Sequence, residues 1–246
     1  MPSFSYQPLT KNGAVMKKIL FLAALILLFT TVSQAQTTYS ETRNLSGFSK
    51  IDFAVAGEVF ITLGNDYSVV IKGDKDYLKE VETNVSGDDL IIKKDKWFDF
   101  INEKVIVEIT MPALDGIRVS GSGKVVVNDP LRGKELNMSV SGSGKIVLKE
   151  ITLDDVGCHI SGSGSLYIEG PGTVRDLGMS ISGSGSLKGE GVTVSRLDAR
   201  ISGSGNCDCN VTELLKASIS GSGSIYYSGN PKIDASISGS GKVRMK

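Results

Sequence analysis

The chain has 246 residues, and its 27 basic side chains balance 27 acidic ones, so the formal net charge is zero. A neutral chain without a long basic run is poorly suited to nucleic acid, because phosphate binding depends on clustered Lys and Arg. One His and three Cys, in none of the usual ligand spacings, argue against a zinc centre. We therefore expect no nucleic-acid partner, no metal site and no cofactor.

The first 35 residues have the three parts of a secretory signal peptide. Residues 16–18 form a positive start, residues 19–29 are an unbroken apolar run, and a cleavage site between Ala35 and Gln36 comes after them. The apolar run is shorter than the roughly 20 residues that a membrane-spanning helix needs, so a retained anchor is the weaker alternative. No later segment has the length and apolarity of a span. We expect an exported protein, and the sequence does not separate periplasm, cell surface and medium.

The rest of the chain predicts one domain. Residues 16–18 already supply the positive start of the signal peptide. We therefore interpret the residues before them as a stretch upstream of the translation start. Residues 36–47 form a short N-terminal segment. Residues 48–246 form the domain, with an irregular part at 48–113 and regular repeats at 114–246.

A tetrapeptide repeat dominates residues 114–246. Ser-Gly-Ser-Gly occurs seven times, at intervals of 18 to 21 residues. A fixed period of this size indicates stacked supersecondary units. The seven copies begin at Ser120, Ser141, Ser161, Ser182, Ser202, Ser220 and Ser238.

The residues around each copy alternate strictly between apolar and polar. We number positions from the first Ser of each copy, which is position 0. At positions −5, −3, −1, +5 and +7, 33 of the 35 residues are apolar, and Asp115 and Gly189 are the exceptions. The even positions from −4 to +4 hold no apolar side chain. This alternation predicts a strand with one buried face.

The predicted fold class is all-β. Every copy runs in the same sense with the same inward set, which predicts a parallel β-helix, or solenoid, of about seven regular coils stacked about 4.8 Å apart. Residues 48–113 also alternate like strands, and we expect irregular early coils or a paired-strand cap there. The polar stretch from Asp74 to Val85 predicts a short helical turn around Tyr77, Leu78 and Val81.

The glycines and serines of the motif have separate explanations. Glycine within a strand costs about 0.5–1 kcal/mol relative to Ala, so we expect both Gly columns to face inward where the coil leaves no room for a Cβ. The Ser columns then face outward, either as architecture or as a ligand-contacting surface, with an aromatic strip beside them. The candidate binding face consists of Ser120, Ser122, Ser141, Ser143, Ser161, Ser163, Ser182, Ser184, Ser202, Ser204, Tyr167 and Tyr226.

Three further groups of residues call for interpretation. Trp97, Phe98 and Phe100 form either a lid over the end of the solenoid or a partner-binding tip. His159 falls in an outward column and is expected to be solvated. The three cysteines, Cys158, Cys207 and Cys209, fall on inward positions, where packing is the expected role. Cys207 and Cys209 share one face of a strand at the limit of disulfide reach, which leaves a strained bridge as the alternative.

The sequence resembles a known bacterial family in several phrases. They are Phe48-Ser49-Lys50-Ile51-Asp52-Phe53, Gly57-Glu58-Val59-Phe60-Ile61, Val105-Ile106-Val107-Glu108-Ile109-Thr110-Met111-Pro112 and the repeated Val/Ile-Ser-Gly-Ser-Gly strands. The family is the putative auto-transporter adhesin, head GIN domain, and the similarity spans about residues 45–246. It implies a β-helical domain exported to the envelope of Bacteroidetes-type bacteria, with an adhesin role suggested by the name.

Three functions are consistent with this sequence. The first is a non-enzymatic adhesion or binding module of the cell envelope, whose partner is a glycan or a protein. The second is a structural scaffold that self-associates as a homo-oligomer through an open C-terminal coil, where Val243 and Met245 face inward. The third is a carbohydrate-active β-helix enzyme, which the sequence disfavours because no acidic column faces outward.

Overall fold

The computed structural model describes residues 38–94 and 104–246. Residues 38–246 form one compact unit. The predicted cleavage site between Ala35 and Gln36 and the aromatic residues Trp97, Phe98 and Phe100 lie outside the described residues. The N-terminal elements are β1 (Tyr39–Arg43), β2 (Lys50–Ala54), β3 (Gly57–Leu63), β4 (Ser68–Gly73), α2 (Lys75–Leu78), β5 (Val81–Ser86), β6 (Asp89–Lys94) and β7 (Val105–Met111).

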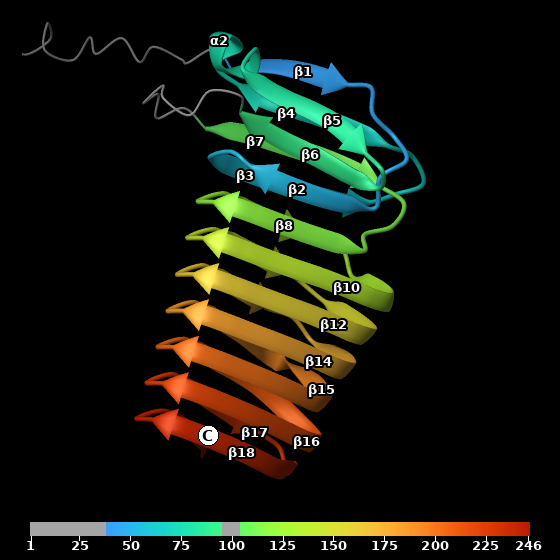
Figure 1. Cartoon of the computed structure of the whole chain (residues 1–246). Helices are drawn as coiled ribbons and strands as arrows, with labels where there is room; N and C mark the ends of the chain where they lie inside the picture. Colours follow the sequence, from blue (N-terminus) through green and yellow to red (C-terminus); the bar gives the residue numbers. More distant parts are fainter. Residues whose placement is uncertain (1–37, 95–103) are drawn as a thin grey trace, which may run out of the picture. The chain divides into compact units, whose positions relative to one another are not determined.

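The repeat region is a stack of parallel coils (Figure 1). In the coil-to-coil register, Ser120 lies opposite Ser141, Ser141 opposite Ser161, and so on to Ser238. This confirms the predicted parallel β-solenoid. Its strands are β8 (Gly116–Gly121), β9 (Lys124–Val127), β10 (Leu131–Gly142), β11 (Lys145–Leu148), β12 (Ile151–Gly162), β13 (Ser165–Ile168), β14 (Gly172–Gly183), β15 (Ser186–Gly203), β16 (Asn206–Gly221), β17 (Ser224–Ser228), β18 (Lys232–Gly239) and β19 (Lys242–Met245).

Three runs of strand segments stack in the repeat region, and the two that meet at the motif are called the front side and the back side. The front side consists of the segments that lead into each motif: β8, the later parts of β10, β12, β14, β15 and β16, and β18. The back side consists of the segments that come after the motif: β9, β11, β13, the first parts of β15 and β16, β17 and β19. The motif is therefore the corner between the two sides.

The N-terminal part combines both structures that the sequence left open. β2 pairs in parallel with β8 and β6, and β3 with β9 and β7, which continues the coils. Beyond them, β4 runs antiparallel to β7 and β1, and β5 runs antiparallel to β6, which forms a paired-strand cap. β1 lies within 36–47, so that segment contributes a strand to the sheet. The predicted helical turn is α2, which contains Tyr77 and Leu78, whereas Val81 begins β5. The Asp74 side chain accepts hydrogen bonds from the backbone N–H groups of Asp76 and Tyr77.

The inward columns form one continuous apolar core. From the first to the sixth motif coil, position −1 is at most 2% exposed, as in Val119 and Ile219. Asp115, which breaks the apolar pattern, is exposed, and the other exception, Gly189, is buried. Among the described residues no polar or charged residue is buried, so hydrophobic contact between coils dominates the stability of the stack.

The first Gly of the motif turns the chain. Its φ is positive in all seven copies, from 91° at Gly121 to 120° at Gly221, a region that only glycine adopts freely. A Cβ on Gly183 would lie 2.5 Å from the carbonyl oxygen of Gly162 in the preceding coil. The expectation that this column faces inward is wrong, since these glycines are half-buried or exposed. The positive φ breaks the alternation because it reverses the chain at the corner.

The second Gly is buried against the coil before it. A Cβ on Gly164 would lie 2.3 Å from Cγ1 of Val140, and one on Gly185 would lie 2.4 Å from Cγ2 of Ile160. The inward orientation and the lack of room for a Cβ are both confirmed for this column. The β-branched residue at position −1 of one coil thus fills the space that the glycine of the next coil leaves free.

Backbone hydrogen bonds continue through the corner. The N–H of Ser143 donates to the carbonyl of Gly121 at 2.8 Å, and the N–H of Lys145 donates to that of Gly123 at 2.9 Å. Both bonds recur up to the sixth motif coil, and the second recurs in the seventh, from Lys242 to Gly223. Main-chain groups, with no serine side chain involved, therefore join one corner to the next.

Replacing Gly185 by Ala should destabilise the stack. The added Cβ would overlap Ile160 and approach the Gly164 carbonyl to 2.8 Å, and overpacking of this kind costs about 1–3 kcal/mol. Urea unfolding followed by circular dichroism measures the loss. Gly178→Ala is the matched control, because the nearest atom to its Cβ is 3.9 Å away and the free energy of unfolding should not fall. Equal midpoints for the two variants would contradict the steric account.

Candidate functional site

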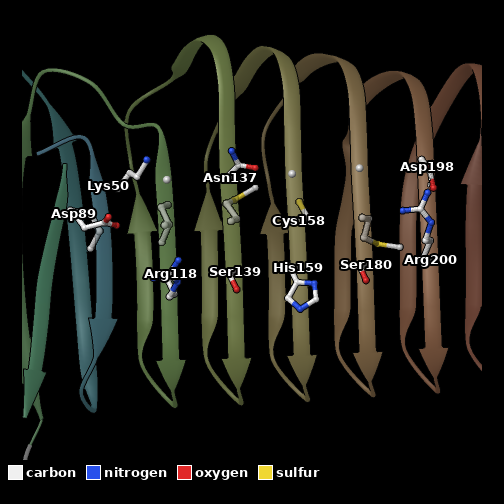
Figure 2. A pocket seen from close by; sticks show the side chains of 17 residues that line it. Lys50, Asp89, Arg118, Asn137, Ser139, Cys158, His159, Ser180, Asp198 and Arg200 are labelled. Atoms are coloured by element: carbon white, nitrogen blue, oxygen red, sulfur yellow. Dashed lines mark hydrogen bonds and ion pairs between the residues drawn. The ribbon is translucent and has the colours of Figure 1, made fainter. Parts of the chain in front are cut away.

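A shallow groove of about 560 Å³ crosses the outward surface of the front side. It runs from β6 across β2, β8, β10, β12 and β14 to β15, perpendicular to the strands (Figure 2). Six steps between strands separate its ends, which is about 29 Å at the usual strand spacing. We call the outward residues at positions −4 and −2 of these coils the groove face: Gly116, Asn137, Gly157, Gly178, Asp198, Arg118, Ser139, His159, Ser180 and Arg200.

Position −4 forms the floor of the groove. Three of its five residues are glycines, namely Gly116, Gly157 and Gly178. A Cβ on Gly157 would lie 2.3 Å from Oδ1 of Asn137, so the amide of one coil lies over the glycine of the next. Around Gly178 no atom outside its chain neighbours lies closer than 3.9 Å to that position. The backbone is therefore accessible along part of the groove floor.

Position −2 forms one bank of the groove. Figure 2 shows its five side chains in a row on neighbouring strands of the front side. Arg118 and Arg200 stand at the ends of the row, and Ser139, His159 and Ser180 lie between them. These side chains are hydrogen-bonding groups from adjacent coils, held at one strand spacing from each other.

Ion pairs balance the charges at the ends of the groove. Arg118 pairs with Asp52 at 3.2 Å, and Arg200 pairs with Asp198 at 2.9 Å. Lys50 pairs with Asp88 at 2.8 Å, and the hydrogen bond and charge of Asp88 raise the pKa of the Lys50 ammonium. Because each cation has a carboxylate beside it, the groove has little net charge.

A ladder of acidic and basic side chains runs next to the groove, two or three residues before position −4. Arg175 bonds to Asp155 and to Asp176, each at 3.0 Å. Arg196 bonds to both oxygens of Asp176, at 2.5 and 2.6 Å. These hydrogen bonds, with the charges of the two guanidinium groups, lower the pKa of Asp176 to about 2. The ladder joins β12, β14 and β15, three strands that carry the groove.

The predicted Ser face divides at the corner. Position 0, which includes Ser141 and Ser161, lies on the front side two residues after the bank of the groove. Position +2, which includes Ser143 and Ser163, lies on the corner itself and is exposed. Within residues 38–94 and 104–246, no hydrogen bond joins hydroxyls of either column. The serine pair that is joined is Ser165 and Ser186, at 3.1 Å on the back side.

The two predicted tyrosines lie around the corner from the groove. Tyr167 is in β13 and Tyr226 in β17, both on the back side. The ammonium groups of Lys145 and Lys188 lie 4.7 and 5.5 Å from the Tyr167 ring centre. Cation–π contacts of this kind cover the ring with the chain's own lysines. The structure therefore does not join these tyrosines and the first Ser column into one surface.

The cysteines are packing residues of the core. All three are free and at most 4% exposed, and burial raises the pKa of the Cys158 thiol. The Sγ atoms of Cys207 and Cys209 are 3.7 Å apart. In the part of the chain that the structure describes, no cluster of three or more His, Cys, Asp or Glu is arranged to hold a metal ion. That part also contains no helix with the length and apolarity needed to cross a membrane.

Sequence reasoning placed His159 on the surface and missed the groove around it. The imidazole is exposed, as expected, and it stands on the bank between Ser139 and Ser180. The signal was present in the recurrence of glycine at position −4 in three of five consecutive coils. The glycine column alone does not reveal a groove, because the groove also depends on which side chains lie beside that column in the folded chain.

Comparison with known proteins agrees with this fold. A profile of the family described as "Putative auto-transporter adhesin, head GIN domain" matches residues 47–231, and the chain belongs to this family. A crystal structure of a putative adhesin from Bacteroides fragilis is similar, with 24% identity and a TM-score of 0.79 over 86% of this chain and 98% of that one. No curated protein matches the sequence.

Two structures from Parabacteroides distasonis have the same fold. One is described as a putative adhesin, with 24% identity and a TM-score of 0.71 over 86% of this chain and 98% of that one. The other is described as a putative lipid binding protein, with 23% identity and a TM-score of 0.69 over 85% of this chain and 96% of that one. At these identities the likeness establishes the solenoid and not the ligand.

The ladder beside the groove predicts a pH dependence of stability. Because the pKa of Asp176 is about 2 in the folded chain, below its ordinary value of 3.8, its ion pairs stabilise the fold above about pH 4. That stability is lost as the pH falls toward 2. Asp176→Asn should therefore lower the thermal midpoint at pH 7 and leave it nearly unchanged at pH 2, as measured by circular dichroism.

The control for this experiment is Asp66→Asn. Asp66 is exposed and makes no ion pair within the described residues, so its removal should leave the difference between the two pH values unchanged. A loss for Asp176→Asn that is equally large at both pH values would contradict the assignment.

Proposed function

We propose that this member of the head GIN domain family is an exported, non-enzymatic binding module of the bacterial cell envelope, and that its groove face binds an extended glycan. The observation that carries the proposal is the groove, which is about 29 Å long, has polar side chains along one bank and has a floor that is open at Gly178. The family's adhesin description and the predicted signal peptide support export and attachment. The fold by itself names no ligand.

The lining of the groove favours a sugar polymer. Glycan hydroxyls need both donors and acceptors, and the hydroxyl, amide and imidazole groups of Ser139, Asn137 and His159 supply them. At Gly178, where no side chain covers the backbone, a flat ring has room to approach the strand. Because equivalent groups recur in successive coils, a linear polymer lying along the stack would meet similar contacts several times.

An acyl chain is a poorer ligand for this surface. The apolar side chains at position −3, such as Met138 and Met179, are only 2–3% exposed and point into the core. Desolvating the charged and hydroxyl groups of the bank under a hydrocarbon chain would be unfavourable. The lipid-binding description of one similar structure therefore receives little support from the groove of this chain.

The positions of the acidic groups support a binding role over hydrolysis. Glycosidases place two carboxyl groups about 5–10 Å apart across the scissile bond. The carboxylates that line the groove are Asp89 in β6 and Asp198 in β15. Six steps between strands separate them, about 29 Å, and Asp198 is bonded to Arg200.

Gly178→Trp tests the proposal by filling the groove. An indole at this exposed, uncrowded position should block a glycan and weaken its binding at least 10-fold without unfolding the stack. A glycan array probed with residues 36–246 identifies the glycan, and titration calorimetry then compares the two proteins. Circular dichroism confirms that the variant is folded.

Gly133→Trp is the matched control. Gly133 is also exposed, the nearest atom to its Cβ position is 3.7 Å away, and it lies outside the groove. Binding of the glycan by this variant should equal that of the parent chain. Unchanged binding by Gly178→Trp would contradict the assignment of the site, and binding of peptides or lipid vesicles in place of glycans would contradict the ligand class.

A further inference from the structure

The last coil exposes an apolar edge that the other coils bury. Ile233 and Ile237 in β18 are 44% and 43% exposed, whereas the residues at the same positions one coil earlier, Leu215 and Ile219, are at most 2% exposed. Met245 in β19 is 63% exposed. These three account for half of the large hydrophobic side chains that are exposed in the described part of the chain.

Both strands of this coil also present unpaired backbone groups. In the described residues, β18 pairs with β16 alone and β19 pairs with β17 alone. An exposed strand edge next to an apolar surface is a template for pairing with a further strand. Figure 1 shows β18 as the outermost front strand at the end of the stack opposite the cap.

We propose that this edge binds a second copy of the chain across a twofold axis, so that two stacks join end to end. The cap explains why the assembly closes as a dimer. The outer strands there, β1 and β5, are polar, and they run antiparallel to their neighbours. They do not repeat the apolar columns that β18 would need in a head-to-tail partner, so identical edges are the matching surfaces.

The pattern of β18 selects one register. Two β18 strands related by a twofold axis run antiparallel, and inward residues must face inward residues. If Ala235 lies opposite its own copy, Ile233 lies opposite the partner's Ile237 and Ile237 lies opposite the partner's Ile233. Four isoleucines then close the core between the two stacks.

The same register is compatible with the outward residues. Lys232 lies opposite the partner's Ser238, and Asp234 lies opposite the partner's Ser236. No like charges face each other directly within the pair of strands, which avoids a destabilising cross-strand contact. In β19, Lys246 bonds to Glu190 and to Asp208 of the earlier coils, so its charge is neutralised by its own chain.

Sedimentation equilibrium of residues 36–246 tests the dimer. The parent chain should sediment with twice its monomer mass at micromolar concentration, and Ile237→Lys should be monomeric because it places two charges in the apolar contact. Ile106→Lys is the matched control, since Ile106 is 42% exposed in β7 and should leave the dimer intact. A parent chain that is monomeric up to about 100 µM would overturn the proposal, as would a dimer that survives Ile237→Lys.

A cross-linking experiment tests the register independently of any loss of folding. Residues directly opposite each other in antiparallel strands have Cα atoms about 4.5–5.5 Å apart, within disulfide reach. Under a glutathione redox buffer, Ala235→Cys should give a disulfide-linked dimer on non-reducing gels. Asp234→Cys and the parent chain, whose own cysteines are buried, should not. Equal cross-linking of the two variants, or none for Ala235→Cys, would overturn the proposed register.

Discussion

The structure depends on the contact between corners of successive coils, where no Cβ fits. From the second motif on, the first glycine turns with a positive φ directly over the glycine of the preceding coil, and the second glycine lies against a branched side chain such as Ile160. Both contacts are specific to one alignment of neighbouring coils. Because the corner fixes the register, every other position stacks on its equivalent, and a residue type repeated in one column becomes a linear surface. The groove is such a surface, built from positions −4 and −2 of successive coils.

Much of the fold could be predicted because its causes are local in sequence. Strict alternation of apolar and polar residues around each motif indicates strands with one buried face. The repeats all run in the same chain direction with a period of 18 to 21 residues, which indicates parallel stacking. The short helix at Tyr77 and Leu78 begins after a capping residue, Asp74, which is also a local signal. The core positions were predicted in the same way, since they are the odd positions of the pattern. In β18, the same pattern leaves Ile233 and Ile237 exposed on the edge that pairs with no strand of the described residues.

The features that sequence reasoning missed depend on geometry across coils. Alternation predicts an inward first Gly, but its positive φ changes the orientation of the backbone there. The same corner places Tyr167 on the back side, although sequence distance suggested that it lay beside the serines. Pairing of β1 with β4 joins segments whose spacing carries no repeat signal. The ion pairs of Asp176 with Arg175 and Arg196 form in connecting segments that vary in length from coil to coil. Sequence spacing therefore does not predict them, and the fold does.

The central claim is that the glycines of the motif hold the corner and that the serine hydroxyls are dispensable for the fold. Its most direct test replaces both serines by Ala in three consecutive coils, at positions 141, 143, 161, 163, 182 and 184, and leaves every glycine in place. Hydrogen exchange of the backbone amides then reports on the coil-to-coil bonds, such as the one from Ser163 to Gly142. We expect protection in these coils to match that of the parent chain, because the main chain makes those bonds. Loss of protection confined to the three substituted coils would contradict the account and assign a structural role to the serine hydroxyls.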